Sequence, residues 1–198
     1  MWNKAEKFLS KDKYIAVLIQ KWGSCTIKKS LTSKYFEDLL ESIVNQQLSG
    51  RAASTIFGRV KDLCDGDINP DIILKLSEEK LRKAGLSFAK IRYIKDLAGR
   101  TKSGELDLRK LDRLNDEEVI EKLVVVKGIG RWTAEMFLMF SLARPDVFPI
   151  DDLGIRKGFE KVTGKKFDRV KSARFALKSW APFRTVASWY LWRSLENR

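Results

Sequence analysis

The chain has 198 residues, 44% of them hydrophobic and 33% charged, a composition typical of a folded globular protein. Its formal net charge of +13 is large for this length. Nucleic-acid binding is the commonest reason for such an excess, and a lysine-rich proteome or a thermophile surface is the alternative. The absence of histidine excludes Ser-His and Cys-His catalytic triads and a His-rich zinc site. The two distant cysteines, Cys25 and Cys64, exclude a four-cysteine iron–sulfur cluster but leave a disulfide between them open.

No stretch approaches the ~20 apolar residues of a membrane span, and the charged residues within positions 1–10 argue against a signal peptide. We therefore expect no membrane partner and a cytoplasmic protein, which in a prokaryote would be associated with the nucleoid. Without histidine, any catalysis must use Asp, Glu, Lys, Tyr, Trp or backbone groups.

Helical periodicity runs through nearly the whole chain and predicts an all-α fold. In chain order, we expect a β-like stretch or buried helical turn at Tyr14–Ile19, a helix containing Phe36–Val44 with Thr32 or Ser33 as its cap, and helices at Ala52–Leu63, Ile72–Leu76, Glu78–Ala84 (capped by Ser77) and Phe88–Arg100. These are followed by a helix from an Asn115–Glu118 capping box to Val124, then by Trp132–Leu142, a helix opened by Asp151 or Asp152, Asp168–Trp180 and Phe183–Ser194.

The segment around Gly128-Ile129-Gly130 predicts two helices joined by a tight turn. The two glycines permit backbone conformations that expose N–H groups, and the following helix directs its N-terminal N–H groups at the same place. Lys127 and Arg131 flank the turn and add positive charge. We therefore expect this turn to bind a nucleic-acid phosphate, although a plain helix–turn–helix corner would use the same residues.

Four separated motifs resemble the helix-hairpin-helix DNA glycosylase superfamily, which includes endonuclease III, and its DNA-3-methyladenine glycosylase II branch. In chain order they are Ile43–Ser49, Ala84–Lys90, Gly128–Ala134 (GIGRWTA) and Asp146–Leu153 (DVFPIDDL). The resemblance covers roughly residues 33–195. It departs at the hairpin, where the family's usual Leu-Pro is Val126-Lys127.

The resemblance implies two helical lobes with a cleft between them, within a single compact core over residues 1–198. One sub-lobe would span about residues 33–142 and contain the hairpin, and the other would combine 1–32 with about 150–198. The N-terminal β domain of the bacterial relative would be missing. No cofactor is implied, except that the hairpin can hold Na+ or K+ on the backbone carbonyls of Val124, Val126 and Ile129. Residues Lys127 to Arg131 and Thr133 would contact DNA.

The carboxylate of Asp152 matches the family's catalytic aspartate by its spacing from the hairpin. A carboxylate suits this chemistry because cleavage of an N-glycosidic bond builds oxocarbenium character on the sugar, and the same group can orient the attacking water. We expect the adjacent Asp151 to cap the helix instead. On the bare sequence, helix capping by both aspartates is the competing interpretation.

The resemblance also places Trp132 and Trp192 in an aromatic pocket, where an indole would attract a cationic alkylated purine by ~1–2 kcal/mol. In relatives that cut the strand, the Trp132 position holds a nucleophilic lysine. Without that amine we expect a monofunctional enzyme, and Lys127 is a poor substitute.

A target base must be flipped out of the duplex, and a side chain then fills the gap. The resemblance assigns this role to the loop Gln46-Gln47-Leu48, with Gln47 as first choice and Gln46 as second. An ordinary helix end is the alternative.

The resulting prediction is a base-excision-repair glycosylase that acts on alkylated purines of the 3-methyladenine and 7-methylguanine type in double-stranded DNA, as a monomer. Within the same fold, the alternative substrates are hypoxanthine, uracil and oxidised bases. A helix-hairpin-helix DNA-binding protein without catalysis and a basic helical RNA-binding protein are the competing functions. The first of these gives no reason for a carboxylate at Asp152.

Overall fold

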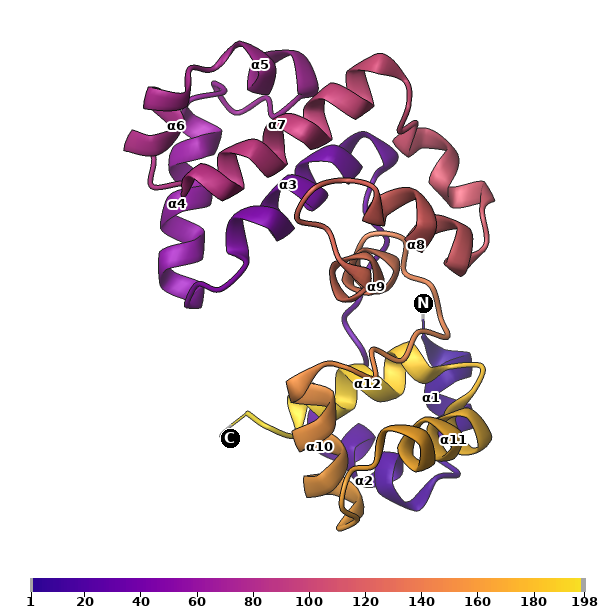
Figure 1. Cartoon of the computed structure of the whole chain (residues 1–198). Coiled ribbons are helices and arrows are strands. Elements are labelled where there is room, and N and C mark those ends of the chain that lie inside the picture. The colour runs from indigo at the N-terminus through magenta and orange to yellow at the C-terminus, as the bar shows by residue number, and fades with distance from the viewer. Residues whose placement is uncertain (1, 197–198) are drawn as a thin grey trace. The chain divides into compact units, whose positions relative to one another are not determined.

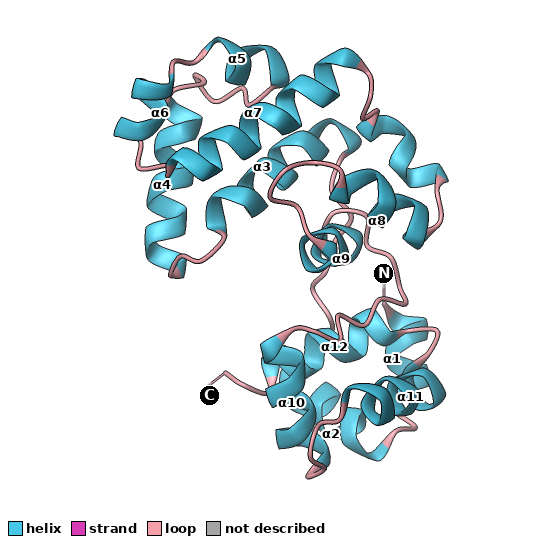
Figure 2. Ribbon diagram, viewed as in Figure 1, coloured by secondary structure: helices cyan, strands magenta, loops and turns pink. Residues whose placement is uncertain are grey.

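A computed structural model describes residues Trp2–Glu196, and within this range every regular element is helical (Figures 1 and 2). The predicted all-α fold is therefore confirmed. The chain forms two compact units: unit 1 combines Met1–Lys29 with Leu138–Arg198, and unit 2 is Ser30–Phe137. In the described part of the chain, no helix is both long and apolar enough to cross a membrane. Cys25 and Cys64 are free, buried thiols.

Unit 2 is built around the long helix α7, which packs against α3, α5 and α6 (Figure 1). Its elements are η1 (Thr32–Lys34), α3 (Tyr35–Asn45), α4 (Gly50–Asp62), α5 (Pro70–Lys75), α6 (Glu78–Lys83), α7 (Phe88–Ser103), η2 (Leu108–Arg113), α8 (Asp116–Val124) and most of α9 (Arg131–Phe140). Aliphatic side chains that recur every three or four residues, such as Leu39, Leu40 and Ile43 on α3, are fully buried. This is the spacing expected for an amphipathic helix that faces a core.

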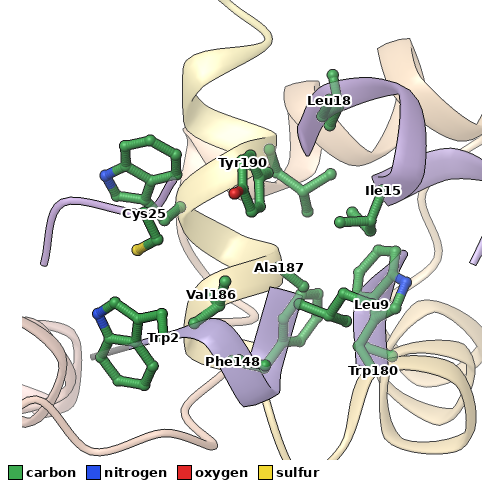
Figure 3. Close-up of a cluster of buried hydrophobic side chains, with 14 of the residues drawn as sticks. Trp2, Leu9, Ile15, Leu18, Cys25, Phe148, Trp180, Val186, Ala187 and Tyr190 are labelled. Atoms are coloured by element: carbon green, nitrogen blue, oxygen red, sulfur yellow. The ribbon is translucent and has the colours of Figure 1, made fainter. Parts of the chain in front are cut away.

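Unit 1 is centred on helix α12, which contacts each of the other four helices of the unit. Its helices are α1 (Asn3–Leu9), α2 (Lys13–Trp22), α10 (Leu153–Thr163), α11 (Arg169–Trp180) and α12 (Arg184–Arg193). Figure 3 shows Val186, Ala187 and Tyr190 of α12 inside the buried cluster, with Leu9 and Ile15 from the N-terminal helices. Burial of this apolar surface holds together segments that lie at opposite ends of the sequence.

Local capping rules account for most helix starts. Ser77 and the Asn115–Glu118 capping box take the predicted roles, and Asp12 caps a helix over the Tyr14–Ile19 stretch that the sequence left ambiguous. The predicted cap at Thr32 or Ser33 is wrong. Both residues form the 3-10 turn η1, and the Thr32 hydroxyl lies 3.5 Å from a carboxylate oxygen of Asp112. That partner is distant in sequence, so no local rule could identify it.

Candidate active site and nucleic-acid interface

The hairpin between α8 and α9 is held by three contacts with neighbouring elements of unit 2. Gly128 has φ +82°, and a Cβ atom there would overlap the ring of Tyr93, so only glycine fits. The carboxylate of Asp96 accepts the backbone N–H of Lys127 at 2.9 Å. The side-chain amide of Gln46 donates to the carbonyl of Gly128 at 2.8 Å. The turn is therefore a fixed part of this unit.

Two of the donors predicted to bind a phosphate at the hairpin already form hydrogen bonds within the protein. The N–H of Ile129 donates to the carbonyl of Val126 at 3.0 Å, inside the turn. The guanidinium of Arg131 donates to both carboxylate oxygens of Glu117, at 2.9 and 2.6 Å, and lies 3.3 Å from Glu135. This contact with Arg131 lowers the pKa of Glu117. Phosphate binding by these residues stays a prediction. The N–H groups at the start of α9 could supply it, because the first N–H groups of a helix have no intrahelical acceptor.

The loop Gln46–Leu48 joins α3 to α4, and the structure gives its two glutamines different environments. Gln46 is half-buried and bound to the hairpin, whereas Gln47 is exposed in a left-handed conformation with φ 58°. The ammonium of Lys90 donates to the carbonyls of Val44 and Gln46, each at 2.7 Å. Lys90 thus closes the end of α3 and holds the base of the loop, and burial lowers its pKa.

Trp132 and Thr133 lie at the start of α9 in a cavity of about 570 Å³. The cavity is lined by Ser42, Asn45, Gln46, Gln47, Leu48, Trp132, Thr133 and Met136. The side chain of Trp132 is 45% exposed, which is unusual for the largest apolar residue type, whereas Thr133 is buried. The structure therefore brings together one predicted pocket residue and the predicted plugging loop, all within unit 2.

Asp152 lies in unit 1 as the N-cap of α10. Its Oδ1 atom accepts the N–H of Ile155 at 2.7 Å and the indole N–H of Trp192 at 2.8 Å. Trp192 also packs against Phe140, with 5.8 Å between ring centroids. Two of the predicted site residues, Asp152 and Trp192, are thus joined directly, and the two donors fix the orientation of the carboxylate.

The predicted capping role of Asp151 is wrong. Asp152 caps α10, and Asp151 instead accepts two hydrogen bonds from the guanidinium of Arg169, at 2.8 and 3.0 Å. A pocket of about 440 Å³ adjoins both aspartates and includes Arg156 and Arg169 among its lining residues. The two adjacent carboxylates therefore have separate partners, and Asp152 combines the cap with its position beside the pocket.

Sequence reasoning missed the residue that makes room for Trp192. A Cβ atom on Gly154 would lie 2.6 Å from Trp192 Cδ1 and 3.0 Å from Asp152 Oδ1. The first distance is shorter than real Cβ contacts and the second is at their lower limit, so the indole would have to shift from the start of α10. The only signal in the sequence is a glycine in the first turn of a helix, where it has no evident use.

Sequence reasoning also missed the contacts that anchor the loop leading to Asp152. The guanidinium of Arg184 binds the Asp146 carboxylate at 2.8 and 2.9 Å. The hydroxyl of Thr185 donates to the carbonyl of Arg144 and accepts the N–H of Val147, at 2.6 and 2.9 Å. Because these partners are about 40 residues apart, no local pattern marks them.

Comparisons with known proteins identify the family of the chain. The family model of the HhH-GPD superfamily base excision DNA repair protein matches residues 40–182. DNA-3-methyladenine glycosylase 1 of Schizosaccharomyces pombe is 38% identical over 200 residues, which cover 97% of this chain and 87% of the relative.

Two solved structures resemble the whole chain. The 3-methyladenine DNA glycosylase of S. pombe, in complex with abasic DNA, superposes with a TM-score of 0.85 and 38% identity, covering 97% of this chain and 96% of that one. A DNA-3-methyladenine glycosidase from Bacillus halodurans gives a TM-score of 0.84 and 39% identity, over 97% and 88% of the two chains.

Proposed function

This chain belongs to the HhH-GPD superfamily of base excision DNA repair proteins, and from that membership we propose that it is a DNA-3-methyladenine glycosylase that releases alkylated purines from duplex DNA. The observation that carries the proposal is the carboxylate of Asp152, held at the N-terminus of α10 by the Ile155 amide and the Trp192 indole. Helix capping requires only the bond from the Ile155 amide, and the second donor, the Trp192 indole, suits a carboxylate that is oriented for catalysis.

The proposed reaction uses Asp152 in two ways. As the bond between base and sugar breaks, positive charge develops on the deoxyribose, and the fixed carboxylate stabilises it. The same carboxylate orients the water that attacks the sugar. An N-alkylated purine carries a positive charge and leaves readily, so the enzyme has no need of a histidine to protonate it.

The damaged base is proposed to leave the duplex before the reaction. Gln47 is the better candidate for filling the resulting gap because it is exposed at the tip of its loop, whereas Gln46 is engaged by the Gly128 carbonyl. Trp132 and Trp192 supply electron-rich indole surfaces that attract a cationic purine.

At the hairpin, the N-terminus of α9 and the glycine-rich turn are proposed to bind a DNA phosphate, with Lys127 exposed beside them. The carbonyls of Val124, Val126 and Ile129 remain candidates for holding Na+ or K+. Val124 ends α8, and the last carbonyls of a helix have no intrahelical donor. The Val126 carbonyl already accepts the N–H of Ile129 and would bind the ion through its second lone pair.

The decisive experiment replaces Asp152 by asparagine. Asp152→Asn keeps an oxygen that can accept both hydrogen bonds but removes the negative charge. We expect release of 3-methyladenine and 7-methylguanine from methylated duplex DNA to fall by roughly 10²–10⁴-fold, the usual range for loss of such a group. Affinity for DNA, measured by fluorescence anisotropy, should stay within about twofold of the wild-type value.

Asp151→Asn is the matched control because it removes the neighbouring charge, which pairs with Arg169. It should leave base release nearly unchanged. Wild-type release by Asp152→Asn would overturn the mechanism, and equal losses in the two variants would overturn the assignment of the catalytic role to Asp152.

A further inference from the structure

The net charge of the protein is distributed very unequally between its two units. Unit 1 contains 20 lysines and arginines against eight aspartates and glutamates, whereas unit 2 contains 19 against 18. Almost the whole excess of +13 therefore belongs to unit 1, although the helix-hairpin-helix turn lies in unit 2. The hairpin alone does not explain the charge of the protein.

Unit 2 carries nearly as many carboxylates as cations, 18 against 19, so its charges are close to balanced. Ion pairs with aspartate or glutamate engage Lys34, Lys61, Lys83, Arg100, Lys102, Arg109, Lys110 and Arg131. Close pairing of this kind leaves little field to attract a distant polyanion.

The strongest run of exposed cations in unit 1 lies on and just before α11. Over residues 165–178 the chain has six basic residues and a single acidic one, Asp168, whose carboxylate accepts the N–H of Lys171 at 2.7 Å as the cap of α11. We call five of the basic residues, all exposed, the α11 basic face: Lys165, Lys166, Lys171, Arg174 and Lys178. Within the described residues, none of these five forms an ion pair with a carboxylate, and Lys165 lies over the ring of Phe175.

Helix geometry aligns three of these cations. Lys171, Arg174 and Lys178 are spaced i, i+3, i+7, so they form one stripe about 10 Å long. The opposite side of α11 is buried through Ser172, Ala176 and Trp180. The buried side fixes α11 in unit 1, and the stripe faces solvent as a row of positive charge.

The beginning of α11 also lies beside Asp152. Arg169 pairs with Asp151, and Phe167, Asp168 and Arg169 line the same pocket as Asp152. A DNA strand that presents a nucleotide to Asp152 must continue away from that pocket, and the α11 basic face begins at the pocket's edge.

We propose that the α11 basic face binds the sugar–phosphate backbone of duplex DNA next to the lesion and supplies a large part of the salt-dependent affinity for undamaged DNA. The proposal rests on the proposed function only in taking DNA as the ligand. Binding of this kind reads no sequence, releases counterions, and keeps the enzyme on DNA while it searches for damage.

The test compares two variants that each lose four lysines and one arginine. The α11 variant carries Lys165→Gln, Lys166→Gln, Lys171→Gln, Arg174→Gln and Lys178→Gln. The control variant carries Lys75→Gln, Lys80→Gln, Lys102→Gln, Lys110→Gln and Arg113→Gln, all at exposed positions of unit 2. Both end with the same net charge, and circular dichroism confirms that each is folded.

Affinity for an undamaged duplex is measured against salt concentration. Log K falls as log salt rises, and each lost phosphate contact makes this negative slope shallower by about 0.9. We therefore expect the slope of the α11 variant to become less negative by roughly 3–4 units. We expect its affinity at ~0.1 M salt to fall at least about tenfold, and the slope of the control variant to change by less than about one unit.

Equal changes in the two variants, or a change below about one unit in the α11 variant, would overturn the proposal. Single-turnover base release at saturating enzyme should be retained in the α11 variant. Failure of this inference is thereby separated from failure of the glycosylase function, which Asp152→Asn tests.

Discussion

At the scale of single residues, the contact between Trp192 and Asp152 depends on the absence of a side chain at Gly154. Asp152 is held by the N–H of Ile155 and the indole of Trp192, and that indole occupies the space above Gly154. A carboxylate that stabilises a developing positive charge must be fixed before the reaction begins, because reorganisation during bond cleavage raises the barrier. Gly154 is therefore a positioning residue that acts through Trp192.

Gly154→Ala should separate Trp192 from Asp152 without removing either group. The added methyl would lie 2.6 Å from Trp192 Cδ1, so the ring must shift, and a displacement of about 1 Å at a reacting centre can cost on the order of 10²-fold in rate. Single-turnover base release measures the loss.

Gly99→Ala is the matched control for this substitution. It lies within α7, where an added Cβ meets nothing within 4 Å, and should raise the free energy of unfolding by about 0.5–1 kcal/mol without slowing base release. If Gly154→Ala releases base at the wild-type rate, contact between Trp192 and Asp152 has no part in catalysis.

At the scale of elements, helix α7 fixes two loops by the same device. The ammonium of Lys90 binds the carbonyls of Val44 and Gln46, and that of Lys95 binds the carbonyls of Leu74 and Leu76. Each lysine satisfies carbonyls that the end of a helix leaves without donors. Only the first of these two loops carries the residue proposed to enter DNA.

Because Lys90 and Lys95 make equivalent contacts, substituting each in turn distinguishes an effect of the Gln46–Leu48 loop on base release from an effect on the stability of the protein. Lys90→Met and Lys95→Met each remove two hydrogen bonds to carbonyls, and we expect each to lower the free energy of unfolding in urea by about 1–3 kcal/mol. Base release from duplex DNA should fall about tenfold for Lys90→Met, which corresponds to ~1.4 kcal/mol, and less than about twofold for Lys95→Met. Similar losses in both variants would mean that the loop contributes only through stability.

At the scale of the whole molecule, the similarity to DNA-3-methyladenine glycosylase 1 of S. pombe extends over 97% of this chain. The family's lyase step needs an amine two residues after the second hairpin glycine, and here that residue is Trp132. An indole cannot form a Schiff base with the sugar. The enzyme should therefore stop after base release.

We expect the product to be an intact strand that carries an abasic site. Incubation with methylated duplex DNA should give strand breaks only after treatment with alkali, and borohydride should trap no covalent complex between protein and DNA. An enzyme with a known lyase step serves as the positive control. Spontaneous breaks at the abasic position, together with a trapped complex, would show that another lysine replaces the missing amine.

The sequence alone determines the fold class, most helix positions and the family of this protein. Helix positions, the capping box at Asn115, the glycine turn and the family were predicted because they depend on neighbours three or four residues apart and on short motifs. The resemblance also predicts Asp152 and Trp192 as site residues, and the structure joins the two by a hydrogen bond.

The tertiary structure decided which partner each polar group takes. Asp152 rather than Asp151 caps α10 and binds Trp192, Arg131 pairs with Glu117, and Gln46 binds the hairpin while Gln47 stays exposed. The contacts of Arg131 with Glu117, Asp152 with Trp192 and Gln46 with Gly128 join residues 14 to 82 positions apart. They form because a folded core brings distant segments within reach of short-range hydrogen bonds, and no periodicity in the sequence records them.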